Sequence, residues 1–367
     1  MDIIDLFNSE LMELPRNRSE EDYEEFLRIW MEEFIGAIDT LSGGDWVTQQ
    51  LRTNRDSVKV LCERIQEAFG VYYLGFPHSA YEHLREAIDG VGSWLRILGS
   101  GEDISESLQF LYRVRIGSLS DYRRRDLFHV PFEKRHIVKP QRYSISGLPS
   151  LYLGGSIWLC WEELGRPSFE QMQISRFRAI PNSKIRVLDF GFRPAVIAAF
   201  IATHPAILQT EMLSSKFALA HAICWPLLAA CSVRVKHADC PFIPEYVIPQ
   251  LLLQWIRNES DFHGIRYFSS RISQYVDSPE PAANYVFPAQ TKRPDDFCDV
   301  LAMNFVLSRP MAWPVVQNTD MNSVSPPSGV PEWKLKLNPD LEIPYWHTEF
   351  FRCEAKINSL PCDYVLS

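Results

Sequence analysis

The sequence lacks the short glycine-rich motifs that mark several common classes of enzyme. It has no Gly-x-Gly-x-x-Gly turn and no Walker-type loop, so neither a Rossmann site nor a P-loop is indicated. A Gly-x-Ser-x-Gly elbow is also missing, so the sequence does not indicate a hydrolase of the acyl type.

The sequence also lacks a surplus of positive charge and a long apolar run. It has 37 Lys and Arg against 46 Asp and Glu, and its net charge of −9 argues against a protein that mainly grips a phosphate backbone. Nucleic acid is therefore not an expected partner. No apolar run reaches membrane-spanning length, and the first residues are acidic, unlike the basic start of a secretory signal. We expect a cytoplasmic protein that does not enter a membrane.

No Cys-x-x-Cys pair occurs among the 8 cysteines. In a chain of this length without a signal, they are interpreted as reduced and mostly buried thiols. Cys231, His237 and Cys240 could supply three metal ligands, but their spacing fits no regular zinc pattern and a fourth ligand is not evident. We expect no metal site.

What the sequence does contain is typical of a globular protein, with 46% hydrophobic and 23% charged residues. The first hundred residues show helical spacing of apolar side chains, for example at Tyr23, Phe26, Trp30 and Phe34. Ser19 begins a candidate capping box there. Gly90 and Gly92 are candidate break points in a later helix.

From residue 105 short β-type runs appear among helical ones, at 110–116, 150–153 and 264–269. The predicted fold class is therefore α+β, without the regular alternation of a doubly wound sheet. We predict an all-helical domain over residues 1–103 and a mixed domain over residues 104–367. A Pro- and Ser-rich surface excursion is expected near 315–338.

The helices of residues 1–103 are expected to scaffold or regulate rather than catalyse, because no cluster of titratable residues suggests a site there. Their apolar stripes need covering. We expect them to pack on residues 105–367, with a homodimer through these helices as the alternative.

The most informative stretch of the sequence begins at Arg142. Tyr152 follows ten residues later and Glu163 twenty-one residues later, with a Gly-x-Pro turn at Gly147, and a short strand pattern ends much further on at Ser269. An arginine fork can hold phosphates, a tyrosine ring can face another ring, and a carboxylate can stabilise positive charge on a sugar. Glu162 and Ser270 are the neighbouring alternatives to Glu163 and Ser269.

These motifs together resemble the RES family over roughly residues 110–310. The resemblance implies an ADP-ribosyltransferase-like core that binds NAD as its substrate. It implies that Glu163, Arg142 and Tyr152 are catalytic and that Arg142, Tyr152 and Ser269 contact NAD. The family often carries a further arginine in the first strand of this domain, which corresponds to Arg113, with Arg115 as the alternative.

The resemblance further implies an enzyme that cleaves the bond between nicotinamide and ribose, either as an NAD glycohydrolase or as a phosphorylase. Such family members act as toxins or in antiviral defence, and many are paired with an antitoxin that covers the active site. An antitoxin or another regulatory protein is thus an expected partner. The alternative is an ADP-ribosyltransferase that modifies a protein. The retained Arg, Tyr, Glu and Ser argue against a binding module that has lost its activity.

Overall fold

The computed structural model describes residues 1–99, 108, 110–117, 122–181, 183–259, 261–272, 282–291, 297–318, 334–338 and 341–365. The chain divides into two compact units. The helical unit comprises Met1–Ser100, Pro140–Ile145 and Leu188–Asp261, and the sheet unit comprises Gly101–Lys139, Ser146–Val187 and Phe262–Ser367.

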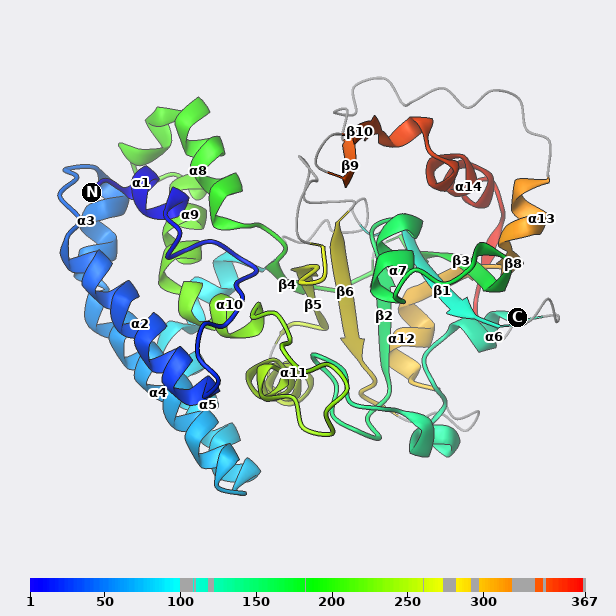
Figure 1. Ribbon diagram of the computed structural model, residues 1–367, viewed down its shortest axis with the longest axis horizontal. Coiled ribbons are helices and arrows are strands. Elements are labelled where there is room, and N and C mark those ends of the chain that lie inside the picture. Colours follow the sequence, from blue (N-terminus) through cyan, green and yellow to red (C-terminus); the bar gives the residue numbers. More distant parts are fainter. Residues whose placement is uncertain are drawn as a thin grey trace. The chain divides into compact units, whose positions relative to one another are not determined.

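The helical unit begins with helices, as the apolar spacing predicted. These are α1 (Ile3–Asn8), α2 (Tyr23–Asp39), α3 (Trp46–Thr53), α4 (Arg55–Tyr73) and α5 (Pro77–Ile97). Figure 1 shows α2, α4 and α5 lying along one another. The expected start at Ser19 is wrong, because Asp22 is the residue whose side chain accepts from the backbone N–H of Glu24 at 2.9 Å. Gly90 and Gly92 do not break α5, which continues through both.

The later part of the helical unit covers the apolar faces of these helices. It contains α8 (Pro194–Thr203), α9 (Leu213–Ile223), α10 (Trp225–Cys231) and α11 (Val247–Glu259), with short 3-10 turns at Pro205–Leu208 and Pro244–Tyr246. The ring of Trp225 lies 5.2 Å from that of Trp30 and 4.2 Å from that of Phe34, measured between centroids. The predicted stripe of α2 is therefore core, and residues from beyond position 105 cover it.

A buried ion pair also joins distant parts of the helical unit. Arg18 Nε lies 3.4 Å from Glu245 Oε1, with both side chains almost fully buried. The hydroxyl of Tyr23 donates to the carbonyl of Ala230 at 3.4 Å.

The predicted domain boundary at residue 103 lies near the end of the first segment of the helical unit, Met1–Ser100. However, residues 140–145 and 188–261 cluster with that segment, because their contacts are with its helices.

The sheet unit is built on antiparallel strands in the order β11, β7, β3, β1, β2, β6 and β5, with β8 also paired to β3. The strands are β1 (Leu111–Ile116), β2 (Ser150–Gly154), β3 (Met172–Ala179), β5 (Gly264–Phe268), β6 (Ala283–Pro288), β7 (Phe305–Ser308), β8 (Met311–Ala312) and β11 (Cys362–Asp363). Strand β4 (Val187–Phe190) lies where the chain passes between the two units, and β9 (Lys334–Asn338) and β10 (Leu341–Pro344) form a separate hairpin.

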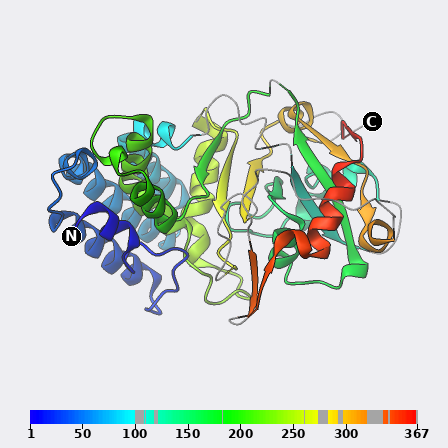
Figure 2. The ribbon, with the colours of Figure 1, turned by 90° about the horizontal axis from the view of Figure 1, so that it is seen from above.

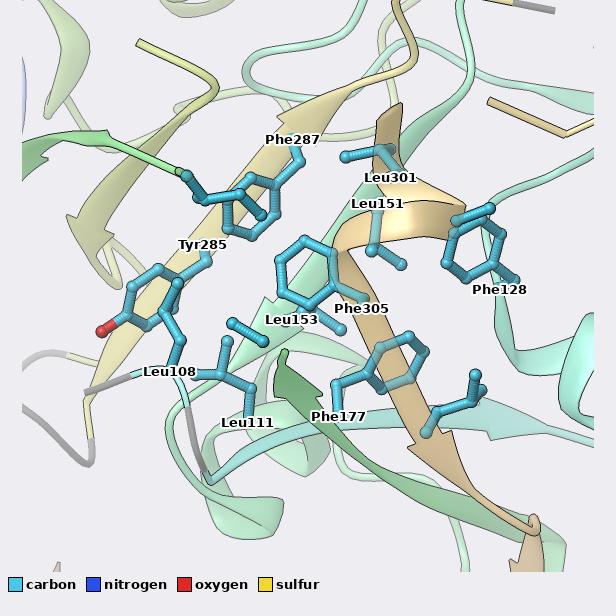
Figure 3. Packing of buried hydrophobic residues seen from close by; sticks show 14 of the residues in the cluster. Leu108, Leu111, Phe128, Leu151, Leu153, Phe177, Tyr285, Phe287, Leu301 and Phe305 are labelled. Carbon is cyan, nitrogen blue, oxygen red and sulfur yellow. The ribbon is translucent and has the colours of Figure 1, made fainter. Parts of the chain in front are cut away.

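One face of the sheet carries an aromatic core. Phe177, Phe287 and Phe305 converge from β3, β6 and β7, and α12 (Asp299–Asn304) covers them together with residues near the short helix α6 (Arg124–Leu127). Figure 3 shows these rings among leucines of β1 and β2. Alternation along the strands sends every second side chain to this face.

The other face of the sheet packs against three helices, α7 (Ile157–Glu163), α13 (Trp313–Gln317) and α14 (Glu349–Asn358). The hairpin β9–β10 joins this side through Leu335, which packs with Trp158 and Tyr345. Figure 2 shows the hairpin next to α14, which is red. Short 3-10 turns at Phe132–Ile137, Phe169–Gln171 and Tyr345–His347 complete the unit.

The sequence therefore predicts the fold class correctly, since helices and a mixed sheet are both present. The predicted strands at 110–116, 150–153 and 264–269 correspond to β1, β2 and β5. Of the expected excursion at 315–338, only 315–318 and 334–338 are described, and residues 319–333 lie outside the described chain.

Helix α7 approaches the sheet closely at Gly154. A Cβ at this position would lie 2.7 Å from the Sγ of Cys160 and 3.3 Å from the carbonyl oxygen of Ser156. Gly154→Ala is expected to lower the free energy of unfolding by about 1–3 kcal/mol, the usual cost of overpacking. Denaturant unfolding measures this change. Gly92→Ala is the control, because a Cβ there meets nothing within 4 Å. Equal stability of the two variants would contradict the close approach.

The start of α7 is held by a buried carboxyl group of α14. Oε1 of Glu354 accepts from the backbone N–H of Ile157 at 2.6 Å and from the Tyr345 hydroxyl at 2.5 Å. Burial raises the pKa of Glu354 from 4.5 to about 8, although these two hydrogen bonds act in the opposite direction. The folded protein therefore holds a proton here that the unfolded chain releases at lower pH.

This proton makes stability depend on pH. Between pH 4.5 and 8 the folded state retains the proton and the unfolded state does not, so the free energy of unfolding falls as pH rises, by up to about 1.4 kcal/mol per pH unit. Glu354→Gln keeps an acceptor without the titration. We expect its stability to fall less between pH 5 and pH 8 in denaturant unfolding. Glu349→Gln, on the same helix but half-exposed, should keep the wild-type slope. Identical slopes for all three proteins would contradict this prediction.

Candidate functional site

Four of the five predicted site residues belong to the sheet unit. Arg113 lies on β1, Tyr152 on β2, Glu163 at the end of α7 and Ser269 directly after β5. Arg142 belongs to the helical unit. The candidate site is therefore built first around Glu163.

Local structure fixes the direction of α7 and hence of Glu163. The side chain of Ser156 caps the helix by accepting from the backbone N–H of Leu159 at 3.1 Å. Glu354 accepts from the following residue, and Gly154 allows the helix to rest on the sheet. These contacts hold the start of a helix whose last residue is Glu163.

The carboxylate of Glu163 is held by two side chains. Nδ2 of Asn284 donates to Oε1 at 2.6 Å, and Nε of Arg271 lies 3.6 Å from Oε2. Asn284 is only 6% exposed, whereas the Glu163 side chain is 31% exposed. The carboxylate thus has a fixed orientation and remains open to solvent.

The adjacent Glu162 has a different and more local environment. Its Oε2 accepts from Nε of Arg166 at 2.9 Å, in an ion pair between residues that are four apart in the sequence. The guanidinium of Arg166 also lies over the ring of Trp161, with its central carbon 5.5 Å from the ring centroid. The two glutamates therefore differ in their contacts, because Glu163 alone is bonded to the sheet through Asn284.

Strand pairing brings Tyr152 to the same face as Asn284. In the β2–β6 ladder Tyr152 pairs with Val286 and Gly154 pairs with Asn284. Directly paired residues project to the same face, and residues two apart share it. This face is the one on which α7 packs. Tyr152 is half-buried there.

Ser269 supports the turn that carries Arg271. Its Oγ accepts from the backbone N–H groups of Arg271 and Ile272 at 3.1 and 3.3 Å, and the residue is buried. The neighbouring Ser270 is half-buried. Neither Arg271 nor Asn284 was predicted from the sequence as a site residue. A lone asparagine in a strand gives no signal, and Arg271 could have been noticed only from its nearness to Ser269.

Arg113 and Arg115 are distinguished by their partners. Nη2 of Arg115 donates to the carbonyl of Phe128 at 3.0 Å. Nη1 of Arg113 is buried and has no hydrogen-bond partner among the described residues. Burial lowers the pKa of Arg113 to about 9, and the nearby charge of Arg115 acts in the same direction, whereas Cys160 and Tyr152 oppose it.

Arg142 has its described contacts within the helical unit. Its Nη1 donates to the carbonyls of Cys231 and Val233 at 3.2 and 3.0 Å, and its guanidinium lies over the ring of Tyr246 at 5.5 Å. These bonds tie residues 140–145 to the end of α10. The turn that follows has Gly147 at φ +76°, as the Gly-x-Pro pattern indicated. The role of Arg142 toward NAD stays a prediction.

No group of three or more His, Cys, Asp or Glu side chains within the described chain could hold a metal ion. No single described helix is long and apolar enough to cross a membrane. The bent pair α9–α10 meets that criterion only when both helices are counted together.

Comparison with known proteins shows a relationship to a bacterial protein. No family model matches the sequence, and no solved structure matches it. The chain is 32% identical over 319 residues to "Putative toxin YopC" of Bacillus subtilis (strain 168). The aligned region covers 83% of this chain and 70% of that relative. This similarity extends across both units, and the chain belongs to the family of that Bacillus subtilis protein.

Proposed function

We propose that this protein is a toxin that consumes NAD by cleaving the bond between nicotinamide and ribose. The Bacillus subtilis relative carries the name of a toxin, and the motifs of the present chain resemble those of RES enzymes. The observation that carries the proposal is the 2.6 Å bond from Asn284 to Glu163. It gives a half-buried carboxylate a fixed orientation on the face that also carries Tyr152.

The chemistry needs such a carboxylate. As the bond between C1′ of the ribose and the nicotinamide nitrogen lengthens, its electron pair leaves with nicotinamide and positive charge builds on the sugar. Nicotinamide departs neutral, so charge placement matters more than a general acid. A carboxylate that is already oriented stabilises this charge more in the transition state than in the ground state. Water or phosphate then attacks C1′ and loses a proton.

The other predicted residues have supporting roles in this proposal. Tyr152 offers its ring to the nicotinamide or the ribose. Arg113 offers the buried Nη1 without a described partner to a negatively charged group of NAD. Ser269 contributes through the turn that it stabilises, in addition to the contact with NAD that the RES resemblance implies.

The acceptor of the ADP-ribose group is water, phosphate or a protein, and one experiment distinguishes these acceptors. Purified protein is incubated with NAD, with and without phosphate and cell lysate. Free nicotinamide and labelled protein are followed separately. Nicotinamide release without labelled protein supports the toxin that destroys NAD. Labelled protein supports the transferase alternative. Intact NAD after hours in the presence of lysate would refute both.

Glu163→Gln tests the catalytic carboxylate. The substitution keeps the shape and removes the charge, so the fold should remain while turnover falls by about 10²–10³. Nicotinamide release by chromatography measures the effect. Glu162→Gln is the matched control and should stay active, because Glu162 pairs only with Arg166 in the described chain. Asn284→Ala should lie between the two. An inactive Glu162→Gln together with an active Glu163→Gln would reassign the carboxylate.

Arg142→Lys tests the predicted grip on the pyrophosphate. Lysine keeps the charge and loses the fork, so both the Michaelis constant for NAD and the turnover should worsen. The thermal unfolding midpoint should also fall, because bonds to the carbonyls of Cys231 and Val233 are weakened. A lower midpoint with unchanged kinetics at a permissive temperature would leave Arg142 a structural role alone.

A further inference from the structure

Arg271 is an exposed arginine that faces the candidate catalytic carboxylate. It lies in the turn after β5, where its backbone N–H donates to the Oγ of Ser269 at 3.1 Å. Its Nε lies 3.6 Å from Oε2 of Glu163, and its side chain is 57% exposed. Within the described chain, neither Nη1 nor Nη2 has a hydrogen-bond partner. One edge of the guanidinium is thus directed to Glu163, and its fork is unused.

Some other arginines of the sheet unit have donors bound by the protein backbone. Arg115, Arg124 and Arg176 each donate to backbone carbonyl oxygens. Arg166 provides the closest comparison, because it also pairs through Nε with a glutamate of α7. It is 64% exposed, but its guanidinium lies over the Trp161 ring, and its partner is four residues away. A local pair accounts for Arg166, whereas Arg271 is brought to Glu163 from a distant turn.

The chemistry of an unused arginine fork favours a phosphate. Two parallel N–H donors match two phosphate oxygens and fix orientation as well as charge. The link to Glu163 is long and solvent-exposed, and such pairs contribute little energy. A phosphate can therefore draw the guanidinium away at small cost. The Glu163 carboxylate then loses a neutralising neighbour and keeps its bond to Asn284.

We infer that Arg271 binds a phosphate group beside Glu163. This inference rests on the proposed function and adds a residue to it. The phosphate group comes either from the diphosphate of the dinucleotide or from free orthophosphate that acts as acceptor. In the second case a phosphate oxygen bonds to C1′ as the bond to nicotinamide breaks. Neutral nicotinamide leaves with the electron pair, and the product is the 1-phosphate of ADP-ribose.

The test compares Arg271→Gln and Arg271→Lys with the control Arg166→Gln in the full chain. Binding of ADP-ribose and of inorganic phosphate is measured by calorimetry, which needs no turnover. The Michaelis constant for NAD and the response of the rate to phosphate are measured alongside. Circular dichroism and the unfolding midpoint establish that each variant is folded. Arg166→Gln should match the wild type in every measurement.

The two sources of phosphate predict different results. If Arg271 binds the diphosphate of the dinucleotide, Arg271→Gln weakens ADP-ribose binding. It also raises the Michaelis constant for NAD by about tenfold or more, which is the scale of one lost charge-assisted contact. If Arg271 binds orthophosphate, Arg271→Gln leaves ADP-ribose binding unchanged. The variant then loses phosphate binding and the stimulation of its rate by phosphate. Arg271→Lys should recover part of either loss.

Failure of the inference is distinguishable from failure of the proposed function. If folded Arg271→Gln binds both ligands as Arg166→Gln does, Arg271 is not a phosphate ligand, whatever the activity. If the wild type binds neither ligand, the inference is equally overturned. If the wild type binds ADP-ribose through Arg271 but leaves NAD intact, the phosphate site stands and the proposed reaction does not.

Discussion

The candidate site depends on the docking of one short helix. A helix of 7 residues such as α7 is not stable in water by itself, because nucleation costs more than so few hydrogen bonds return. Three features hold α7 against the sheet: the cap at Ser156, the hydrogen bond to the carboxyl of Glu354 and the close approach that Gly154 allows. The docked position of α7 brings the Glu163 carboxylate within hydrogen-bond distance of Asn284. The geometry of the site is thus set at the opposite end of the helix from the carboxylate.

Sequence patterns predicted the parts of the fold that obey simple rules. The strands β1, β2 and β5 and the helix α2 were predicted in this way. Strand β3 was not, because Arg176 and Arg178 interrupt its apolar pattern and charged residues usually face solvent. Arg176 is instead buried, since Nη1 donates to the carbonyl of Asn358 at 2.6 Å. A buried arginine that binds backbone carbonyls cannot be distinguished from a surface arginine by its position in the sequence.

The partners of the site residues were likewise not predictable from their positions in the sequence. Spacing along the chain suggested that Arg142 belongs with Tyr152 and Glu163, and it gave no indication that residues 140–145 cluster with the helical unit. The carbonyls of Cys231 and Val233 that receive its hydrogen bonds lie about ninety residues further on. Asn284 likewise becomes informative only when the register of β2 and β6 is known. Partners that are distant in sequence decide what a polar side chain does.

The helical unit is assembled from three separated stretches of the chain, and this has a consequence during synthesis. Trp30 and Phe34 leave the ribosome well before Trp225, the ring that covers them. At about 5–20 residues per second, roughly 10–40 seconds separate these events. Throughout that interval the nascent α2 exposes an aromatic stripe. Non-native apolar contacts of this stripe are therefore possible before Asn284, the residue that orients the Glu163 carboxylate, has been synthesised.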